Sequence, residues 1–149
     1  MKLRQLVEEY LKEARMMQVA TAKDGQPWAC TVYFAFDKEL NLYWISTPTR
    51  RHSLEIENNS KVAGVIVLPH KPGQEVRGIQ FEGVAKSLGK KESMNALKHY
   101  MLRFGMPIKR VKEILAGKDK HVCYGIKPSS IILFDEVNYP DSPRQEYKL

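Results

Sequence analysis

The sequence predicts a mainly β, α+β domain in which about six to seven short antiparallel strands form a barrel or barrel-like sheet. Two observations favour this class. Short β-prone runs separated by turn residues recur along most of the chain, and helical periodicity is confined to the N-terminus, one short insertion and one later excursion. Many short strands with few helices are typical of barrels. The length of 149 residues suits one domain, expected over 1–149.

The N-terminal part of the chain is expected to hold a helix and a β-hairpin. Apolar residues recur at three- and four-residue steps over 3–17, which predicts an amphipathic helix. Two β-prone runs, 18–22 and 28–36, flank the turn signal Asp24-Gly25 and predict a hairpin. Side chains alternate along a strand, so one face of the second run is expected to enter the core. That face carries Trp28, Cys30, Val32, Phe34 and Phe36.

A third strand is predicted over 40–46, followed by a short inserted helix that runs to about Asn59. Thr47 is the expected N-cap of this helix and Pro48 its first residue, because both residue types favour those positions.

Two strands are predicted next. The run 62–68 is apolar on both faces, and we expect it to be covered on both sides. A long strand follows over 76–88, in which Gly78 and Gly83 are expected to mark bends or close backbone approaches.

The last third of the chain begins with a helical excursion over 90–117, expected in two pieces because Gly105-Met106-Pro107 interrupts it. Two closing strands are predicted over 121–126 and 131–135, and the polar tail from Val137 onward is expected to be loose.

Charge and hydropathy limit the classes of partner. The chain has 24 Lys and Arg against 17 Asp and Glu, and the net charge of +7 favours anionic partners. The longest apolar stretch, 62–68, is far shorter than the roughly 20 residues that cross a bilayer, and the N-terminus has no signal-peptide core. We therefore expect a soluble, cytoplasmic protein with no membrane partner. Cys30 and Cys123 are expected to be small buried hydrophobes.

Several common catalytic motifs are absent from the sequence. It contains no GxGxxG, no complete P-loop and no GxSxG. Its four histidines lie too far apart to form a local metal site, and no metal is expected.

One segment carries positive charges at a position where they are locally unfavourable. The predicted helix start after Ser46 carries Arg50, Arg51 and His52, although cations are unfavourable at the positive end of a helix. Free N–H groups, nearby hydroxyls and these cations could together bind a phosphate, which would turn the repulsion into attraction. The alternative is that the arginines are solvated or pair with Glu55 or Glu57 along the helix.

The order and spacing of several segments resemble a known family. These segments are Pro27–Ala35, Leu42–Ser46, Arg51-His52, Glu57–Ala63 and Arg77–Gly83. Together they resemble the FMN-binding split β-barrels related to pyridoxamine 5′-phosphate oxidase, and in particular the small, poorly characterised members of that family. The resemblance implies a split β-barrel that binds FMN.

The resemblance also implies site residues. The flavin ring would lie along the second strand at Cys30, Thr31, Val32 and Tyr33. Ser46, with Thr47 beside it, would contact the ribityl phosphate. Arg51-His52 would clasp that phosphate, with histidine where the family has lysine, and Gln80 would take the place of a family glutamine.

Two departures argue against true pyridoxamine-phosphate oxidation. The oxidase reads the substrate phosphate with a Tyr and an Arg four residues later, whereas Tyr100 is followed by Phe104. The C-terminal Arg-x-His substrate motif is also missing from the tail.

The function expected from the resemblance is therefore an FMN-dependent oxidoreductase with a small-molecule substrate, acting as a homodimer with flavin sites at the interface. Its chemistry belongs to the flavin, so no catalytic side chain is assigned. The alternatives are a haem- or deazaflavin-binding protein and a non-catalytic flavin-binding module. For haem the candidate axial ligands are His70, His99 and His121. Nucleic-acid binding is not expected, because no aromatic residues interleave the basic run 109–121.

Overall fold

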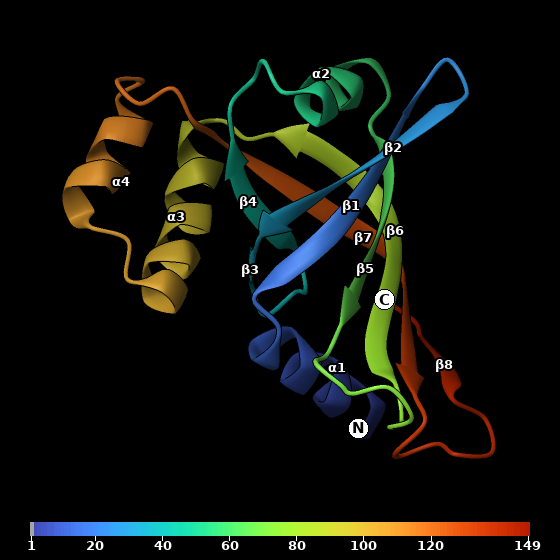
Figure 1. Cartoon of the computed structure of the whole chain (residues 1–149). Coiled ribbons are helices and arrows are strands. Elements are labelled where there is room, and N and C mark those ends of the chain that lie inside the picture. The colour runs from blue at the N-terminus through green and yellow to red at the C-terminus, as the bar shows by residue number, and fades with distance from the viewer. Residues whose placement is uncertain (1) are drawn as a thin grey trace.

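The computed structural model describes residues 2–149, which form four helices and eight strands (Figure 1). In chain order these elements are α1 (Lys2–Glu13), β1 (Met16–Lys23), β2 (Gln26–Tyr33), β3 (Ala35–Phe36), β4 (Leu42–Ser46), α2 (Arg51–Asn58), β5 (Lys61–Val67), β6 (Arg77–Ser87), α3 (Lys90–Phe104), α4 (Ile108–Leu115), β7 (Val122–Asp135) and β8 (Arg144–Tyr147). No helix in this described part of the chain is both long and apolar enough to span a membrane.

The strands form one curled antiparallel sheet in the order β2-β1-β5-β6-β7-β4-β3, with β8 added to β7. This is a split β-barrel, as the sequence predicted, with eight strands instead of six to seven. α1 lies across one end of the sheet, α2 lies at the other end, and the α3–α4 pair stands beside β4 (Figure 1). The main core fills the barrel beneath α1, and a second apolar cluster joins α3 and α4 to β3, β4 and β7.

The first hairpin confirms the turn signal in the sequence. Asp24 and Gly25 both have positive φ angles, 51° and 77°, which is the conformation of a two-residue turn that follows the twist of the strands. The turn sets the register of β1 against β2, with Lys23 opposite Gln26.

Glycines allow close backbone approach along the long strand β6. A Cβ atom at Gly78 would lie 2.5 Å from the carbonyl oxygen of Ile66. A Cβ atom at Gly83 would overlap the carbonyl oxygen of Lys127 and lie 2.9 Å from the Cα atom of Pro128. The register between β6 and β7 also shifts at Glu82/Gly83. Both predictions about these glycines are therefore confirmed.

Replacing Gly83 with alanine is expected to lower the free energy of unfolding by about 1–3 kcal/mol, because the added methyl group meets backbone atoms. Urea denaturation measures the change. Glu82→Ala, at the exposed neighbouring position, is the control and is expected to cost less than about 0.5 kcal/mol. Equal losses for both variants would contradict the steric explanation.

Both predicted helix boundaries near strands are wrong by a few residues. α1 ends at Glu13, because Met17 is a buried member of the alternating pattern of β1. α2 begins at Arg51 and not at Pro48, because the Arg50 N–H donates to the Thr47 carbonyl across a turn, at 3.2 Å. Thr47 is therefore not the N-cap.

The C-terminal region contains more strand than the sequence predicted. β7 runs unbroken through Pro128, although proline has no N–H to donate to a neighbouring strand. Ser129 is the extra residue at the register shift opposite Gly83, so the regular pairing with β6 is already interrupted at this point. The tail is not loose, since β8 pairs with residues 131–134 of β7. Tyr139 and Tyr147 pack against the core from this region.

One side of the sheet is less covered than predicted. β5 alternates between buried and exposed residues, so the expectation of two covered faces is wrong. Of the predicted core face over 28–36, only Phe34, just after β2, is fully buried, whereas Trp28 is 43% exposed. Apart from Lys61 at the start of β5, the uncovered side of β1, β2 and β5 carries uncharged residues over adjacent positions, and we call these uncharged residues the neutral sheet face: Met16, Gln18, Ala20, Ala22, Ala29, Thr31, Tyr33, Ala63, Val65 and Val67.

Candidate binding cavity

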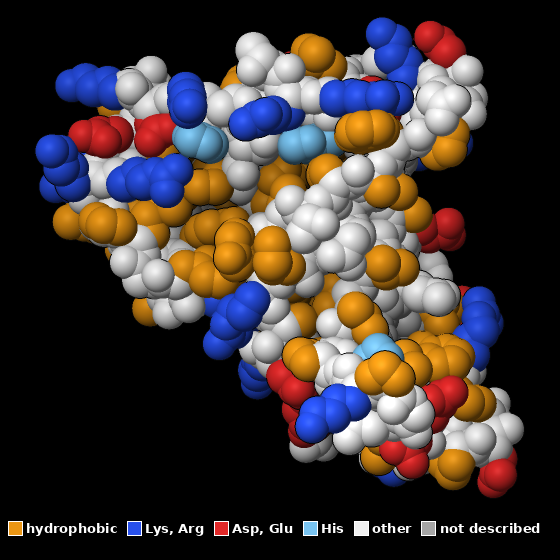
Figure 2. All heavy atoms as spheres, in the orientation of Figure 1, with side chains coloured by type: hydrophobic (Ala, Val, Ile, Leu, Met, Phe, Trp, Pro, Cys, Tyr) orange, Lys and Arg blue, Asp and Glu red, His pale blue; other side chains and the backbone are white. Residues whose placement is uncertain are grey.

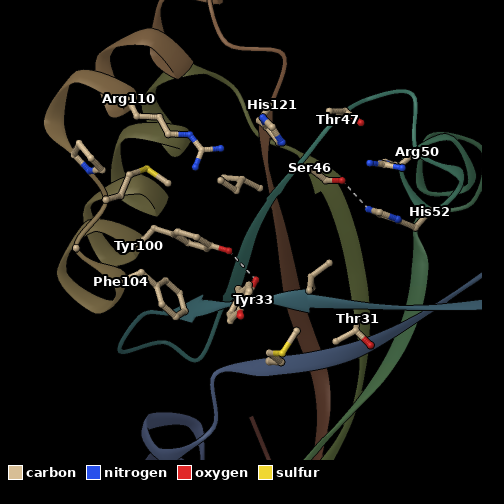
Figure 3. A pocket seen from close by; sticks show the side chains of 16 residues that line it. Thr31, Tyr33, Ser46, Thr47, Arg50, His52, Tyr100, Phe104, Arg110 and His121 are labelled. Atoms are coloured by element: carbon tan, nitrogen blue, oxygen red, sulfur yellow. Dashed lines mark hydrogen bonds between the residues drawn. The ribbon is translucent and has the colours of Figure 1, made fainter.

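A cavity of about 880 Å³ lies between the ends of β2 and β4, the start of α2 and the α3–α4 pair (Figure 3). Cofactor and ligand sites typically measure roughly 300–1,000 Å³. The lining residues are Met16, Thr31, Val32, Tyr33, Ile45, Ser46, Thr47, Arg50, His52, Tyr100, Phe104, Gly105, Met106, Pro107, Arg110 and His121.

The cavity is apolar along one wall and basic along another. Four of its lining residues are Arg or His, and among residues 2–149 no Asp or Glu lines it. Figure 2 shows Lys, Arg and His side chains in a row above a hollow whose surface is largely hydrophobic. Such a cavity favours an anionic ligand with an apolar body.

The α2 end of the cavity holds hydroxyl and cationic groups on adjacent residues. The His52 Nε2 atom lies 2.9 Å from the Ser46 Oγ atom, and Arg50 points toward the same place (Figure 3). The first N–H groups of α2 have no acceptor within the helix, because every helix begins this way. These are the kinds of group that the anion-site hypothesis from the sequence requires, with Arg50 and not Arg51 lining the cavity.

His52 is buried, and its surroundings oppose its charge. Burial, and then the nearby Arg50 guanidinium, lower the pKa of His52 below its ordinary value of 6.5. Protonation of the free protein at this position therefore favours unfolding.

Arg51 does not line the cavity. Its Nε atom lies 2.7 Å from the Glu55 Oε2 atom, and its guanidinium lies 4.0 Å from the centre of the Trp28 ring. Glu55 is buried and also accepts a hydrogen bond from the Thr21 hydroxyl, at 2.8 Å. The ion pair with Glu55, which the sequence left open as an alternative, is therefore the arrangement that forms.

The structure brings most of the predicted site residues together. Those that line the cavity are Thr31, Val32, Tyr33, Ser46, Thr47 and His52. Three others do not. The Cys30 side chain packs partly against the barrel core, Arg51 pairs with Glu55, and Gln80 is exposed on β6 between Val65 and Ile132.

The α3–α4 wall of the cavity carries none of the residues predicted to bind the cofactor, although the resemblance placed Tyr100 and Phe104 at the oxidase's substrate-phosphate position. The Tyr100 hydroxyl donates to the Tyr33 carbonyl at 2.8 Å, which ties α3 to β2. Phe104 stacks edge-on against Tyr33, with 5.7 Å between the ring centres. Arg110 and His121 also line the cavity. The sequence placed Arg110 only in a basic helix side and loop, and named His121 in that run and as a candidate haem ligand. Their role depends on a tertiary contact that leaves no local signal.

No cluster of metal ligands accompanies the cavity. Within residues 2–149, no three His, Cys, Asp or Glu side chains gather closely enough to hold a metal ion.

The pKa of His52 gives a prediction for stability. A folded-state pKa below the unfolded value of about 6.5 makes this contribution fully present above pH 6.5 and progressively lost as the pH falls below it. His52→Gln is expected to show a smaller loss of melting temperature between pH 7.5 and pH 5.5 than the parent chain. Thermal melts at both values measure this, and an unchanged loss would contradict the burial argument.

Comparison with known proteins gives a family match and a set of structural neighbours. A model of the pyridoxamine 5′-phosphate oxidase family matches residues 3–133. A UPF0306 protein of Pasteurella multocida is 34% identical over 83 residues, which cover 55% of this chain and 56% of that protein. A UPF0306 protein of Salmonella schwarzengrund is 28% identical over 106 residues, which cover 70% and 71%.

Solved structures share the fold at low sequence identity. The haem storage protein HutZ of Vibrio cholerae superposes with a TM-score of 0.67 at 20% identity, over 86% of this chain and 91% of that one. An FAD-binding protein of Mesorhizobium loti gives a TM-score of 0.61 at 21% identity, over 83% and 88%. These neighbours bind different cofactors on one fold, so the choice among cofactors rests on the cavity.

Proposed function

The chain belongs to the pyridoxamine 5′-phosphate oxidase family, and from this premise we propose that its cavity binds FMN and that the protein is a flavin-dependent oxidoreductase with a small-molecule substrate. One observation carries the proposal. The cavity combines a cluster of hydroxyl, N–H and cationic groups at α2 with a remainder that is largely apolar apart from Arg110 and His121. FMN has the same division, with a phosphate at one end and a flat ring system at the other.

The residues present suit each part of FMN. A phosphate at Ser46 and Thr47 would accept hydrogen bonds from their hydroxyls and from the first turn of α2. Its negative charge would attract the Arg50 guanidinium, which in the ligand-free chain lies beside buried His52 and lowers its pKa. The ring system would meet the apolar wall of Val32, Ile45 and Phe104.

The chain's own residues orient the ligand and exclude water. A bound flavin supplies hydride and electron transfer. β2 offers its edge to the cavity, and the hydrogen bond from Tyr100 to the Tyr33 carbonyl fixes that edge against α3. Phe104 occupies the place of the substrate-binding arginine of the true oxidase, so the proposed substrate is not pyridoxamine phosphate.

Titration of the purified protein with FMN tests the proposal. We expect about one flavin per chain, with quenched or shifted flavin absorption, and weaker binding of riboflavin because it lacks the phosphate. A lack of any spectral or calorimetric change with FMN would reject the proposed cofactor.

Haem is a second candidate because of the position of one histidine. Of the three histidines proposed as axial ligands, only His121 lines the cavity. Its Nδ1 atom lies 2.7 Å from the Asp119 carboxylate, which leaves Nε2 as the nitrogen that could coordinate the haem iron. Reconstitution with haem would then give a Soret band that His121→Ala weakens, whereas binding of FMN without such a band favours the flavin.

We also propose that the protein is a homodimer with a cavity completed at the interface. Met16, Thr31 and Tyr33 belong both to the cavity wall and to the neutral sheet face. That face exposes 42% of Val65 and 53% of Val67, and exposed apolar patches mark interaction sites. A second copy of the same uncharged face would cover it. Light scattering coupled to size exclusion is expected to give about twice the mass of 17.2 kDa, and a monomer would contradict the shared cavity.

A further inference from the structure

A second pair of cationic side chains enters the cavity away from α2. Arg110 comes from α4 and His121 from the segment before β7, and both point into the cavity opposite Arg50 and His52 (Figure 3). Both are held by one carboxylate. The Asp119 Oδ1 atom lies 2.7 Å from His121 Nδ1, and the Asp119 Oδ2 atom lies 3.5 Å from Arg110 Nε.

Asp119 is itself fixed in place. Its side chain is 16% exposed, and its Oδ1 atom also accepts the backbone N–H of His121 at 2.8 Å. These hydrogen bonds from His121 lower the pKa of the Asp119 carboxyl, so it stays ionised at neutral pH. It therefore works as a positioning residue that orients an arginine and a histidine at once.

The bonds to Asp119 leave the cavity side of both residues free to bind a ligand. Arg110 uses Nε toward Asp119, which leaves its two terminal nitrogens, and these form the fork that suits a planar carboxylate. His121 uses Nδ1 toward Asp119, and in the protonated ring Nε2–H is left to donate to an anion. Asp119 does not line the cavity, so its charge does not directly oppose an anion there.

The surroundings of this pair indicate the rest of the ligand. On the α3–α4 side of the cavity, the same side as Arg110, Tyr100, Phe104 and Met106 offer a largely apolar surface (Figure 3). The α2 end already supplies hydroxyl, N–H and cationic groups for one phosphate. The second pair is thus available for a different negative group.

We infer that Arg110 and His121 form a second anion-binding site, which selects substrates carrying a carboxylate on a flat apolar body. This inference rests on the proposed function, because a bound carboxylate is a substrate only if it shares the cavity with the proposed cofactor. The binding site itself can be measured without flavin.

Benzoate and its neutral isostere benzamide are the probes. Isothermal titration calorimetry is run on the protein alone and on the protein saturated with FMN. We expect benzoate to bind at least about tenfold more tightly than benzamide, because a charge-assisted hydrogen-bonded pair contributes about 1.5–3 kcal/mol. Arg110→Gln and His121→Gln are each expected to remove most of this preference.

Lys109→Gln is the matched control, because Lys109 is an exposed cation on the same helix that does not line the cavity. It is expected to keep the preference for benzoate. Arg110→Lys is expected to retain part of it, since the charge remains but the planar fork is lost. Asp119→Asn is expected to reduce the preference for benzoate over benzamide. In the Asp119→Asn background, His121→Gln is expected to change this preference less than it does in the parent chain.

Three outcomes would overturn the inference. One is equal binding of benzoate and benzamide. Another is an equal loss in Arg110→Gln and Lys109→Gln, which would indicate general electrostatics. The third is a loss of FMN relative to riboflavin in Arg110→Gln as large as that in Arg50→Gln, which would assign the pair to the cofactor phosphate. Failure of FMN binding with an intact, Arg110-dependent benzoate preference would reject the proposed cofactor alone and support this site.

Discussion

Replacing Arg50 with glutamine is expected to weaken FMN binding by about 10- to 100-fold and to leave riboflavin binding nearly unchanged. Arg50 faces the cavity beside Ser46 and His52, where the phosphate is proposed to lie. A hydrogen bond to a charged group contributes about 1.5–3 kcal/mol, which corresponds to this range. Flavin fluorescence titration of both ligands gives the two dissociation constants, and their ratio isolates the phosphate contribution.

Arg51→Gln is the control with the strongest contrast. The two arginines are neighbours in sequence, yet Arg51 is held by Glu55 and Trp28 away from the cavity. Its loss is expected to lower the stability of α2 against β1 and β2 and to leave the ratio of FMN to riboflavin affinity unchanged. If Arg51→Gln instead lowers FMN affinity selectively and Arg50→Gln does not, Arg51 binds the phosphate, as the family resemblance implies, and Arg50 does not.

The contrast between these arginines shows what local sequence can specify. Sequence reasoning located the cationic helix start correctly, because charge against the helix dipole is a local signal. The choice between Arg50 and Arg51 depends on where the helix begins. Each helical residue turns the side-chain direction by about 100°, so a start at Arg51 instead of Pro48 changes which side chains face the cavity. The residue types around Thr47 did not predict the turn that precedes the helix and sets its start.

The same division applies to the fold. The Asp24-Gly25 hairpin and the helix break at Gly105, whose φ is 67°, were predicted because each depends on a few consecutive residues. β8 and the continuation of β7 through Pro128 were missed because they depend on pairing with strands far along the chain. Arg110 was missed as a site residue for the same reason, since the packing of α3 and α4 against the sheet brings it to the cavity. His121 was named only as a candidate haem ligand, and the pairing of β7 with β4, which sets Val122 opposite Ser46, brings it to the cavity.

The uncovered side of β5 is a different kind of failure. The sequence of β5 is apolar on both faces. Strands of this kind are typically buried on both sides, and a partner chain can supply the cover on one side. In the single chain the neutral sheet face is exposed, so the pattern is satisfied only if another surface covers it. The exposure of β5 therefore supports the proposed homodimer, in which a second copy would cover this face.

Val65→Asp is expected to convert the proposed dimer to a monomer at micromolar concentration. Val65 lies on β5, an outer strand of the neutral sheet face, opposite Gln18 of the middle strand β1, and is 42% exposed. A twofold interface repeats every substitution, so one aspartate places two negative charges in an uncharged contact. Like charges brought together cost several kcal/mol, which corresponds to a dimer dissociation constant raised about 100-fold or more. Sedimentation or light scattering across a concentration series measures it.

The same variant also tests whether the cavity needs the partner. Because Thr31 and Tyr33 join the cavity to this face, the monomer is expected to bind FMN at least about tenfold more weakly, with the ring more accessible to a fluorescence quencher. Val137→Asp is the control, since Val137 is 53% exposed and lies in the turn after β7, away from the face. A monomeric Val65→Asp that binds FMN as tightly as the parent chain would place the whole binding energy within one chain. The neutral sheet face would then serve assembly alone, and the exposure of β5 would have no bearing on the cofactor.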